Sequence, residues 1–253
     1  WANLSFGYMK TDYNVRINFR NGAWGELEVS SDEHLNLHMA ATCLHYGQEA
    51  FEGLKAFRGK DGKVRIFRLE ENAARLQSTC QGILMAELPT ERFKEAILKV
   101  VKLNERFIPP YETGASLYIR PLLIGTSAQV GVHPADEYMF VVFVTPVGPY
   151  FKGGFSTNPY VIIREFDRAA PHGTGIYKVG GNYACKILQH DGICIPILGI
   201  FEPKIRIKFR EKVYFFATAF PDYTRHFFYR KTAYISSKKI PLSSTFFSIL
   251  LEL

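Results

Sequence analysis

The sequence predicts an α+β protein, and two kinds of pattern in its N-terminal part carry that prediction. Several short segments alternate polar and apolar residues with period two, which is typical of half-buried strands. Two longer segments space their apolar residues three and four apart, which is typical of amphipathic helices. The chain has 253 residues, 47% of them hydrophobic and 22% charged. That length and composition suit one large or two modest domains around a buried core.

Two β-hairpins are predicted where a pair of strand-like segments flanks a turn sequence. The pairs are residues 14–19 and 25–29 around Asn21-Gly22, and residues 54–57 and 63–67 around the turn at 59–62. Asn-Gly and Asp-Gly are favoured in such turns because both residue types tolerate positive φ.

The remaining predicted elements follow in chain order. They are helices at 70–82 and 91–107, buried strands at 115–124 and 138–144, a Pro- and Gly-rich linker at 146–154, and a strand at 160–164. Apolar, β-branched runs between turn signals favour strands that are covered on both faces. The order of these elements predicts separate strand and helix runs, as in α+β proteins.

The net charge of +7 suggests a nucleic-acid partner, but the excess is confined to the end of the chain. Residues 1–184 carry 20 basic and 19 acidic side chains, whereas residues 185–253 carry 11 and 5. A basic, aromatic tail can stack bases and grip phosphates. The composition of this tail, however, matches neither a solvated protein surface nor a packed core. We therefore predict no nucleic-acid partner.

The apolar runs and the cysteines indicate the compartment. No apolar run is long enough to span a bilayer, and the N-terminus shows no signal peptide. The four cysteines form neither a disulfide framework nor a zinc-ligand spacing. We therefore predict a cytoplasmic protein with no metal site and no membrane contact.

The segment from Gly173 to Ala184 is the richest in candidate chemistry, because Lys178 stands there among glycines with Tyr177 and Tyr183 beside it. Glycines allow a backbone to approach a ligand closely. A partly desolvated lysine can act as a nucleophilic amine. The residues alone leave open the alternative of a surface loop with one solvated lysine.

Two further segments bear on this choice. The segment from Leu44 to Phe57 precedes the second hairpin, and Ser116–Pro121 places Arg120 inside an apolar strand. A buried arginine needs a partner, which is either a substrate carboxylate or a structural ion pair.

Taken together, these segments resemble the branched-chain amino-acid aminotransferases, which are fold-type IV pyridoxal-phosphate enzymes. The matching pieces are HYGQEAFEGLKAFRG, Arg75 within FRLEENAARL, SLYIRP, PVGPYFKGG and KVGGNYA. They occur in family order and at family spacing over about residues 1–184. The resemblance implies transfer of an amino group from Leu, Ile or Val to 2-oxoglutarate with pyridoxal 5′-phosphate as cofactor, in a homodimer.

The resemblance also implies a role for each matching residue. Lys178 corresponds to the catalytic lysine that bonds to the cofactor and then moves a proton. Arg75 corresponds to the arginine on the cofactor phosphate, and Tyr183 to the tyrosine on the cofactor ring oxygen. The positions around the substrate pocket are matched by Tyr46, Phe51, Tyr118, Arg120 and Tyr150.

The domain organisation implied by the resemblance is a small N-terminal α+β domain at 1–147, a linker at 148–156, and an incomplete cofactor domain at 157–253. Residues 185–253 do not match the family: they lack the glutamate for the pyridine nitrogen and the Gly-Thr turn for the phosphate. One hypothesis is an out-of-frame reading of the remaining gene, and a replacement domain is the alternative. Without those elements we expect weak cofactor binding and little activity.

Three other functions stay open at this point. The first is another enzyme on the same scaffold, either a D-amino-acid aminotransferase or a deaminating lyase. The second is a non-enzymatic remnant, which would fail to bind pyridoxal phosphate. The third is a nucleic-acid-binding protein, whose affinity would fall steeply with salt.

Overall fold

The computed structural model describes residues 1, 3–149, 158–160, 169–170, 172–187, 213–217, 229–231, 234–235 and 238–239. The chain divides into two compact units. The first unit combines Trp1–Lys152 with Asp167–Gln189, and the second combines Gly153–Phe166 with His190–Leu253.

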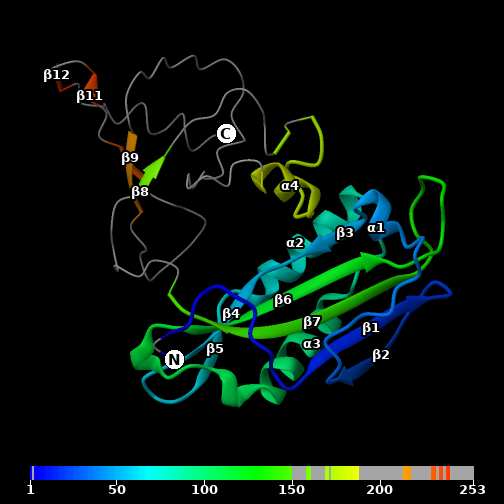
Figure 1. The fold of residues 1–253 in the computed structure, drawn as a ribbon, viewed down its shortest axis with the longest axis horizontal. Coiled ribbons are helices and arrows are strands. Elements are labelled where there is room, and N and C mark those ends of the chain that lie inside the picture. Colours follow the sequence, from blue (N-terminus) through cyan, green and yellow to red (C-terminus); the bar gives the residue numbers. More distant parts are fainter. Residues whose placement is uncertain are drawn as a thin grey trace. The chain divides into compact units, whose positions relative to one another are not determined.

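The first unit is built on one antiparallel sheet with the strand order β2-β1-β7-β6-β4-β5 (Figure 1). The short strand β3 pairs with β6 on the same edge as β4. The strands are β1 (Asn14–Arg20), β2 (Ala23–Ser30), β3 (Glu49–Phe51), β4 (Leu54–Arg58), β5 (Val64–Ile66), β6 (Ser116–Gly125) and β7 (Tyr138–Val147). Both predicted hairpins, β1/β2 and β4/β5, are present with antiparallel pairing.

Four α-helices occur in the described part of the chain. They are α1 (Thr42–Tyr46), α2 (Leu69–Gly82), α3 (Thr90–Leu103) and α4 (Gly181–Ile187), and short 3₁₀ turns cover Glu105–Phe107 and Tyr111–Thr113. The apolar stripes of α2 and α3 pack on the sheet and form one core with it. The α+β fold predicted from the sequence is confirmed.

Alternation along β6 decides which residues enter the core. Leu117, Ile119 and Leu123 are fully buried in the cluster that includes the helices. Because successive side chains of a strand point to opposite faces, Tyr118 and Arg120 lie on the face away from α2 and α3. One strand thus supplies both the core and two predicted site residues.

The predicted helix at 91–107 is wrong at its C-terminal end, because α3 stops at Leu103. The cause is Asn104, whose side chain is fully buried. Its Oδ1 accepts hydrogen bonds from the backbone N–H groups of Asp12 (3.0 Å) and Tyr13 (3.1 Å), and its Nδ2 donates to the carbonyls of Tyr13 (2.9 Å) and Val100 (2.8 Å). This tertiary contact favours a turn over another helical residue, and sequence periodicity does not report it.

Replacing Asn104 with alanine is expected to cost about 2–3 kcal/mol of unfolding free energy. The variant removes four hydrogen bonds of a fully buried side chain, three of them to partly buried backbone groups of the 12–13 segment, and each contributes about 0.5–1.5 kcal/mol. Urea unfolding of Asn104→Ala beside the control Asn36→Ala, at an exposed loop position, measures the loss. A change below about 0.5 kcal/mol would contradict the role assigned to Asn104.

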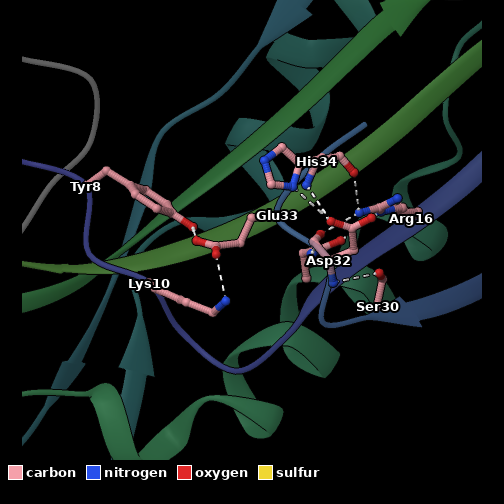
Figure 2. Close-up of polar contacts among 8 residues, drawn as sticks. Tyr8, Lys10, Arg16, Ser30, Asp32, Glu33 and His34 are labelled. Carbon is pink, nitrogen blue, oxygen red and sulfur yellow. Dashed lines mark hydrogen bonds and ion pairs between the residues drawn. The ribbon is translucent and has the colours of Figure 1, made fainter. Parts of the chain in front are cut away.

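The N-terminal segment is attached along β7 and at the loop that follows β2. Figure 2 shows that Tyr8 and Lys10 both reach Glu33: the Tyr8 hydroxyl donates at 2.7 Å, and the Lys10 ammonium lies 2.7 Å from the other carboxylate oxygen. Burial, together with the Glu33 carboxylate, raises the pKa of Tyr8 to about 12. The segment continues to Phe6, whose ring meets the edge of Tyr118 at 5.8 Å between centroids. The N-terminus therefore borders the face of the sheet that carries Tyr118.

The described strands of the second unit form two small sheets. β8 (Asn158–Tyr160), β9 (Val213–Ala217) and β10 (Tyr229–Lys231) make an antiparallel sheet in the order β10-β9-β8, and β11 (Tyr234–Ile235) pairs with β12 (Lys238–Lys239). Of the strand predicted at 160–164, only Tyr160 lies within the described residues. Most of the 148–156 linker and of the tail also lies outside them, so the out-of-frame hypothesis stays a prediction. Within the described residues, no helix has both the length and the apolar character needed to cross a bilayer.

Candidate active site

Strand β3 places two neighbouring side chains on opposite sides of the sheet. Phe51 pairs directly with Leu122 of β6, so its ring lies on the same face as Tyr118 and Arg120. Glu52 follows, points the other way and is completely buried beside α2. The short segment formed by β3 and Glu52 therefore contributes to two neighbouring clusters. One lies around the Phe51 ring, and the other lies around the Glu52 carboxylate.

On the Phe51 side, the amine of Lys178 is in contact with two aromatic residues. Its Nζ donates a hydrogen bond to the Tyr183 hydroxyl at 2.6 Å. The same nitrogen lies 4.1 Å from the centre of the Phe51 ring and 4.7 Å from that of Tyr183. The two rings meet edge to face at 5.1 Å. A single amine is thus held beside one phenol and over one apolar ring.

The loop that carries Lys178 is fixed at its backbone. Its N–H donates to Thr79 of α2 at 3.1 Å, and its carbonyl accepts from the Phe51 N–H at 3.1 Å. The buried side chain of Asn182 cross-links the same loop. It accepts a hydrogen bond from the Thr174 hydroxyl (2.9 Å) and donates to the carbonyls of Thr174 (2.7 Å) and Tyr177 (2.9 Å). These bonds hold the Lys178 backbone in place before any ligand arrives.

Arg120 approaches the same Phe51 ring from β6. Its guanidinium carbon lies 5.0 Å from the Phe51 ring centre and 5.3 Å from that of Tyr118, and it donates to the Tyr118 hydroxyl at 3.1 Å. The Nε of Arg120 is buried, and no hydrogen-bond partner for it occurs among the described residues. A buried donor on a cation is costly to leave unpaired, so this group suits an anionic ligand.

On the other side of β3, Arg75 of α2 makes a bidentate pair with Glu52. Its Nε and Nη2 donate to the two carboxylate oxygens at 2.7 Å each, and Asn72 adds a third bond at 2.7 Å. The Glu52 carboxylate raises the pKa of Arg75, and the nearby Tyr183 adds to that shift while burial opposes it. The Arg75 side chain is 54% exposed and borders a groove of about 730 Å³ that Asn72, Ser78 and Tyr118 also line. One edge of the guanidinium, formed by Nε and Nη2, therefore binds Glu52, while the side chain as a whole also borders the open groove.

The structure brings together five of the predicted site residues around the Phe51 ring: Phe51, Tyr118, Arg120, Lys178 and Tyr183. Arg75 pairs with Glu52 instead, and Tyr183 is close enough to contribute to the raised pKa of Arg75. Tyr46 instead hydrogen-bonds the Val130 carbonyl, and Tyr150 lies outside the described residues. Arg120 has no ion-pair partner within the described ranges, so the structural ion pair considered for it is not seen there.

Sequence reasoning missed three residues that hold the site in position: Glu52, Thr79 and Asn182. The signal for Glu52 was its place directly after Phe51, because strand alternation sends neighbours to opposite sides. Thr79 and Asn182 carry no comparable signal, since their partners are distant in sequence or are backbone groups. Within the described residues, no group of three or more His, Cys, Asp or Glu side chains is arranged to hold a metal ion.

Comparison with known proteins places this geometry in context. No protein-family model matches the chain. The branched-chain-amino-acid aminotransferase of Haemophilus influenzae is 49% identical over 191 residues, which is 76% of this chain and 55% of that protein. The enzyme of the same name from Helicobacter pylori is 49% identical over 191 residues, which is 75% of this chain and 56% of that protein. The chain therefore spans about half the length of the curated relatives it matches.

Solved structures of branched-chain aminotransferases share the fold of this chain. The Escherichia coli branched-chain amino acid aminotransferase superposes with a TM-score of 0.52 at 24% identity, covering 71% of this chain and 55% of that one. A second branched-chain amino acid aminotransferase, solved with pyridoxamine 5′-phosphate, gives a TM-score of 0.50 at 26% identity and covers 68% of this chain and 53% of that one. The resemblance drawn from residues 1–184 is confirmed. Over about three quarters of its length, the chain is similar in sequence to the branched-chain-amino-acid aminotransferases, and its described core has the fold-type IV architecture of those enzymes.

Proposed function

We propose that this chain carries the catalytic lysine of a branched-chain amino-acid transaminase, which transfers amino groups between Leu, Ile or Val and 2-oxoglutarate with pyridoxal 5′-phosphate. Relatives of that name at 49% identity support the proposal. The single observation that carries it is the meeting of the Lys178 amine and the Arg120 guanidinium on one ring, that of Phe51.

The residues present suit the proposed cofactor in three respects. Lys178 offers an amine for its aldehyde carbon, Tyr183 offers a phenol for its ring oxygen, and Arg75 offers a charged, half-exposed donor for its phosphate. A guanidinium suits phosphate because its N–H groups form a fixed fork. The Glu52 pair orients that fork from behind.

Each side chain then has a defined task. Lys178 bonds to the cofactor and afterwards carries the proton at its Nζ, and Tyr183 keeps that nitrogen within hydrogen-bond reach. When bound, the cofactor supplies the electron sink for the reaction. Arg120 holds the substrate carboxylate through the donor that has no partner among the described residues.

The proposed substrate class follows from the apolar surfaces beside Arg120. Phe51 and Tyr118 line the space next to the guanidinium, and Tyr46 and Tyr150 are proposed to complete it. Selectivity among Val, Leu and Ile would be modest, because one methylene in an apolar pocket contributes about 1–3 kcal/mol.

We also propose the wider organisation that the resemblance implies: a small domain at 1–147, a linker at 148–156 and part of a cofactor domain from 157, in a cytoplasmic homodimer. Exposed apolar side chains on two neighbouring loops support self-association. Met39, Val130 and Val132 are 83%, 84% and 83% exposed, on two loops joined by the Gln129 N–H to Ala40 carbonyl bond (3.1 Å). Neighbouring exposed apolar side chains of this kind favour a protein interface.

The experiment that tests the function follows 2-oxo acid formation by the full chain supplied with pyridoxal phosphate. L-leucine, L-isoleucine and L-valine should each yield their 2-oxo acid, at least to one equivalent per bound cofactor. A preference for D-alanine, or release of ammonia in place of amino transfer, would favour the alternative enzymes on this scaffold. Failure to bind the cofactor would favour the non-enzymatic remnant.

A further inference from the structure

Thr79 is a polar residue on the buried face of α2. It is only 1% exposed, and the other buried side chains of this helix are apolar: Leu69, Ala73, Leu76 and Cys80. A valine has nearly the same branched shape, so packing alone does not require a hydroxyl at this position. A buried hydroxyl needs a hydrogen-bond partner, and that of Thr79 accepts from the Lys178 N–H at 3.1 Å. The hydroxyl therefore serves the loop that carries Lys178.

The backbone of Lys178 is held from two sides. Its N–H donates to Thr79 of α2, and its carbonyl accepts from the Phe51 N–H of β3 at 3.1 Å. The side chain that starts from this backbone brings Nζ to 2.6 Å from the Tyr183 hydroxyl and 4.1 Å from the Phe51 ring centre. A shift of the backbone moves the amine with it, so the place of the amine depends on both backbone bonds.

The residue before Lys178 rests on the same end of α2. A Cβ built on Gly82, the last residue of the helix, would overlap the Tyr177 ring, so the ring lies directly against the helix backbone. Gly82 follows Thr79 by three residues, a spacing that places both on one side of a helix. The last turn of α2 is thus the seat for both Tyr177 and Lys178.

The same helix carries Arg75, and the contacts form a closed circuit. Arg75 lies four residues before Thr79, which is about one helical turn. It binds the Glu52 carboxylate through two hydrogen bonds of 2.7 Å. Glu52 directly follows Phe51, whose N–H bonds the Lys178 carbonyl. The Lys178 N–H then returns to Thr79 on α2. The guanidinium and the amine are therefore held by one helix and one short strand.

We propose that Thr79 is a positioning residue for Lys178: its hydroxyl ties the lysine backbone to the helix that also carries Arg75, so that α2 sets the spacing between the amine and the guanidinium. The consequence for the cofactor rests on the proposed function, in which these two groups take the aldehyde and the phosphate of pyridoxal phosphate. The bond between Thr79 and Lys178 does not rest on it, and each is tested by its own readout.

The bond is tested with variants that differ in the hydroxyl. Thr79→Val keeps the branched shape and removes the hydroxyl, and Thr79→Ser keeps the hydroxyl. The matched control is Thr90→Val, which removes a hydroxyl that accepts from Gln77 of the same helix α2 at 3.3 Å. The first readout is amide hydrogen exchange of the full chain without cofactor. Exchange at Lys178 is divided by exchange at Val142, a buried residue of the central strand β7.

Thr79→Val should raise this exchange ratio about 2- to 10-fold, because one hydrogen bond between neutral groups is lost. Thr79→Ala, a second variant without the hydroxyl, should raise it at least as much. Thr79→Ser and Thr90→Val should stay close to the parent. A ratio that stays at the parent value in Thr79→Val and Thr79→Ala, or that rises equally in Thr79→Ser or Thr90→Val, would overturn the role of the hydroxyl.

The second readout separates the amine from the phosphate contact. Calorimetry compares pyridoxal phosphate with deoxypyridoxine 5′-phosphate, which has the same phosphate but a methyl group in place of the aldehyde. Thr79→Val should bind pyridoxal phosphate at least several-fold more weakly than the parent, and Thr79→Ser should restore most of the affinity. The methyl analogue cannot bond to Lys178, so the parent and Thr79→Val should bind it equally through Arg75.

Two results would overturn the positioning role. An equal loss of affinity for both ligands in Thr79→Val would show that Thr79 supports the site as a whole. Unchanged affinity for both ligands, with the exchange ratio raised, would show that the amine does not depend on this bond. If the parent binds neither ligand while the exchange pattern holds, the proposed function fails and the bond between Thr79 and Lys178 stands.

Discussion

Replacing Lys178 with methionine is expected to abolish stable retention of pyridoxal phosphate by this chain. Methionine keeps much of the side-chain length over the Phe51 ring but has no amine to bond the cofactor. After borohydride reduction and dialysis, the parent should keep cofactor even if its reversible binding is weak, and the variant should keep none above the background of non-specific lysine labelling. Any amino-transfer rate should fall by at least about 10³-fold, because the variant lacks the amine that lies beside the Tyr183 hydroxyl.

The matched control is Lys102→Met on α3, where the lysine is exposed and belongs to the face of the helix away from the core. It should retain cofactor like the parent. Equal retention by the parent, Lys178→Met and Lys102→Met would show that the amine at 178 is not the attachment point. Tyr183→Phe is expected to weaken retention without abolishing it, since it removes the hydrogen-bond partner and leaves the amine.

The second large effect is expected at the pair behind β3, and it should be unequal for the two partners. Arg75→Met leaves the Glu52 carboxylate buried with Asn72 as its remaining side-chain donor, and it should cost about 3–5 kcal/mol of unfolding free energy. Glu52→Gln leaves a guanidinium that is 54% exposed and can be solvated, so its cost should be only about 1–2 kcal/mol.

Urea unfolding of the two single variants and of the combined variant measures this asymmetry. The combined loss should be clearly smaller than the two single losses taken together, because the partners act as one unit. Two equal single losses, or strictly additive ones, would show that Glu52 is not held chiefly by Arg75.

Local periodicity predicted the elements that are long and regular. Both hairpins, α2 and the two central strands β6 and β7 follow from alternation or helical spacing together with turn residues. The end of α3 could not be predicted, because Asn104 is fixed by backbone groups of the 12–13 segment, far away in sequence. α1 and β3 are too short to show a period, although β3 organises the whole site.

The reactive residues of the candidate site could be predicted from the sequence, but the residues that hold them in position could not. Lys178 and Arg120 stand out as a lysine among glycines and an arginine in an apolar strand, and the family resemblance gave them roles. The residues that position them act through neighbours. Glu52 acts through Arg75, and Asn182 acts through carbonyls of its own loop. Such roles depend on three-dimensional contacts, which residue type and spacing do not encode.

The most direct test of the account is to locate the amine that pyridoxal phosphate bonds. The full chain is mixed with the cofactor, reduced with borohydride and digested, and the modified peptide is identified by mass spectrometry. We expect one modification per chain, on Lys178 in the peptide that also contains Tyr183. Modification spread over exposed lysines, or absent from Lys178, would contradict the assignment of this loop as the catalytic site.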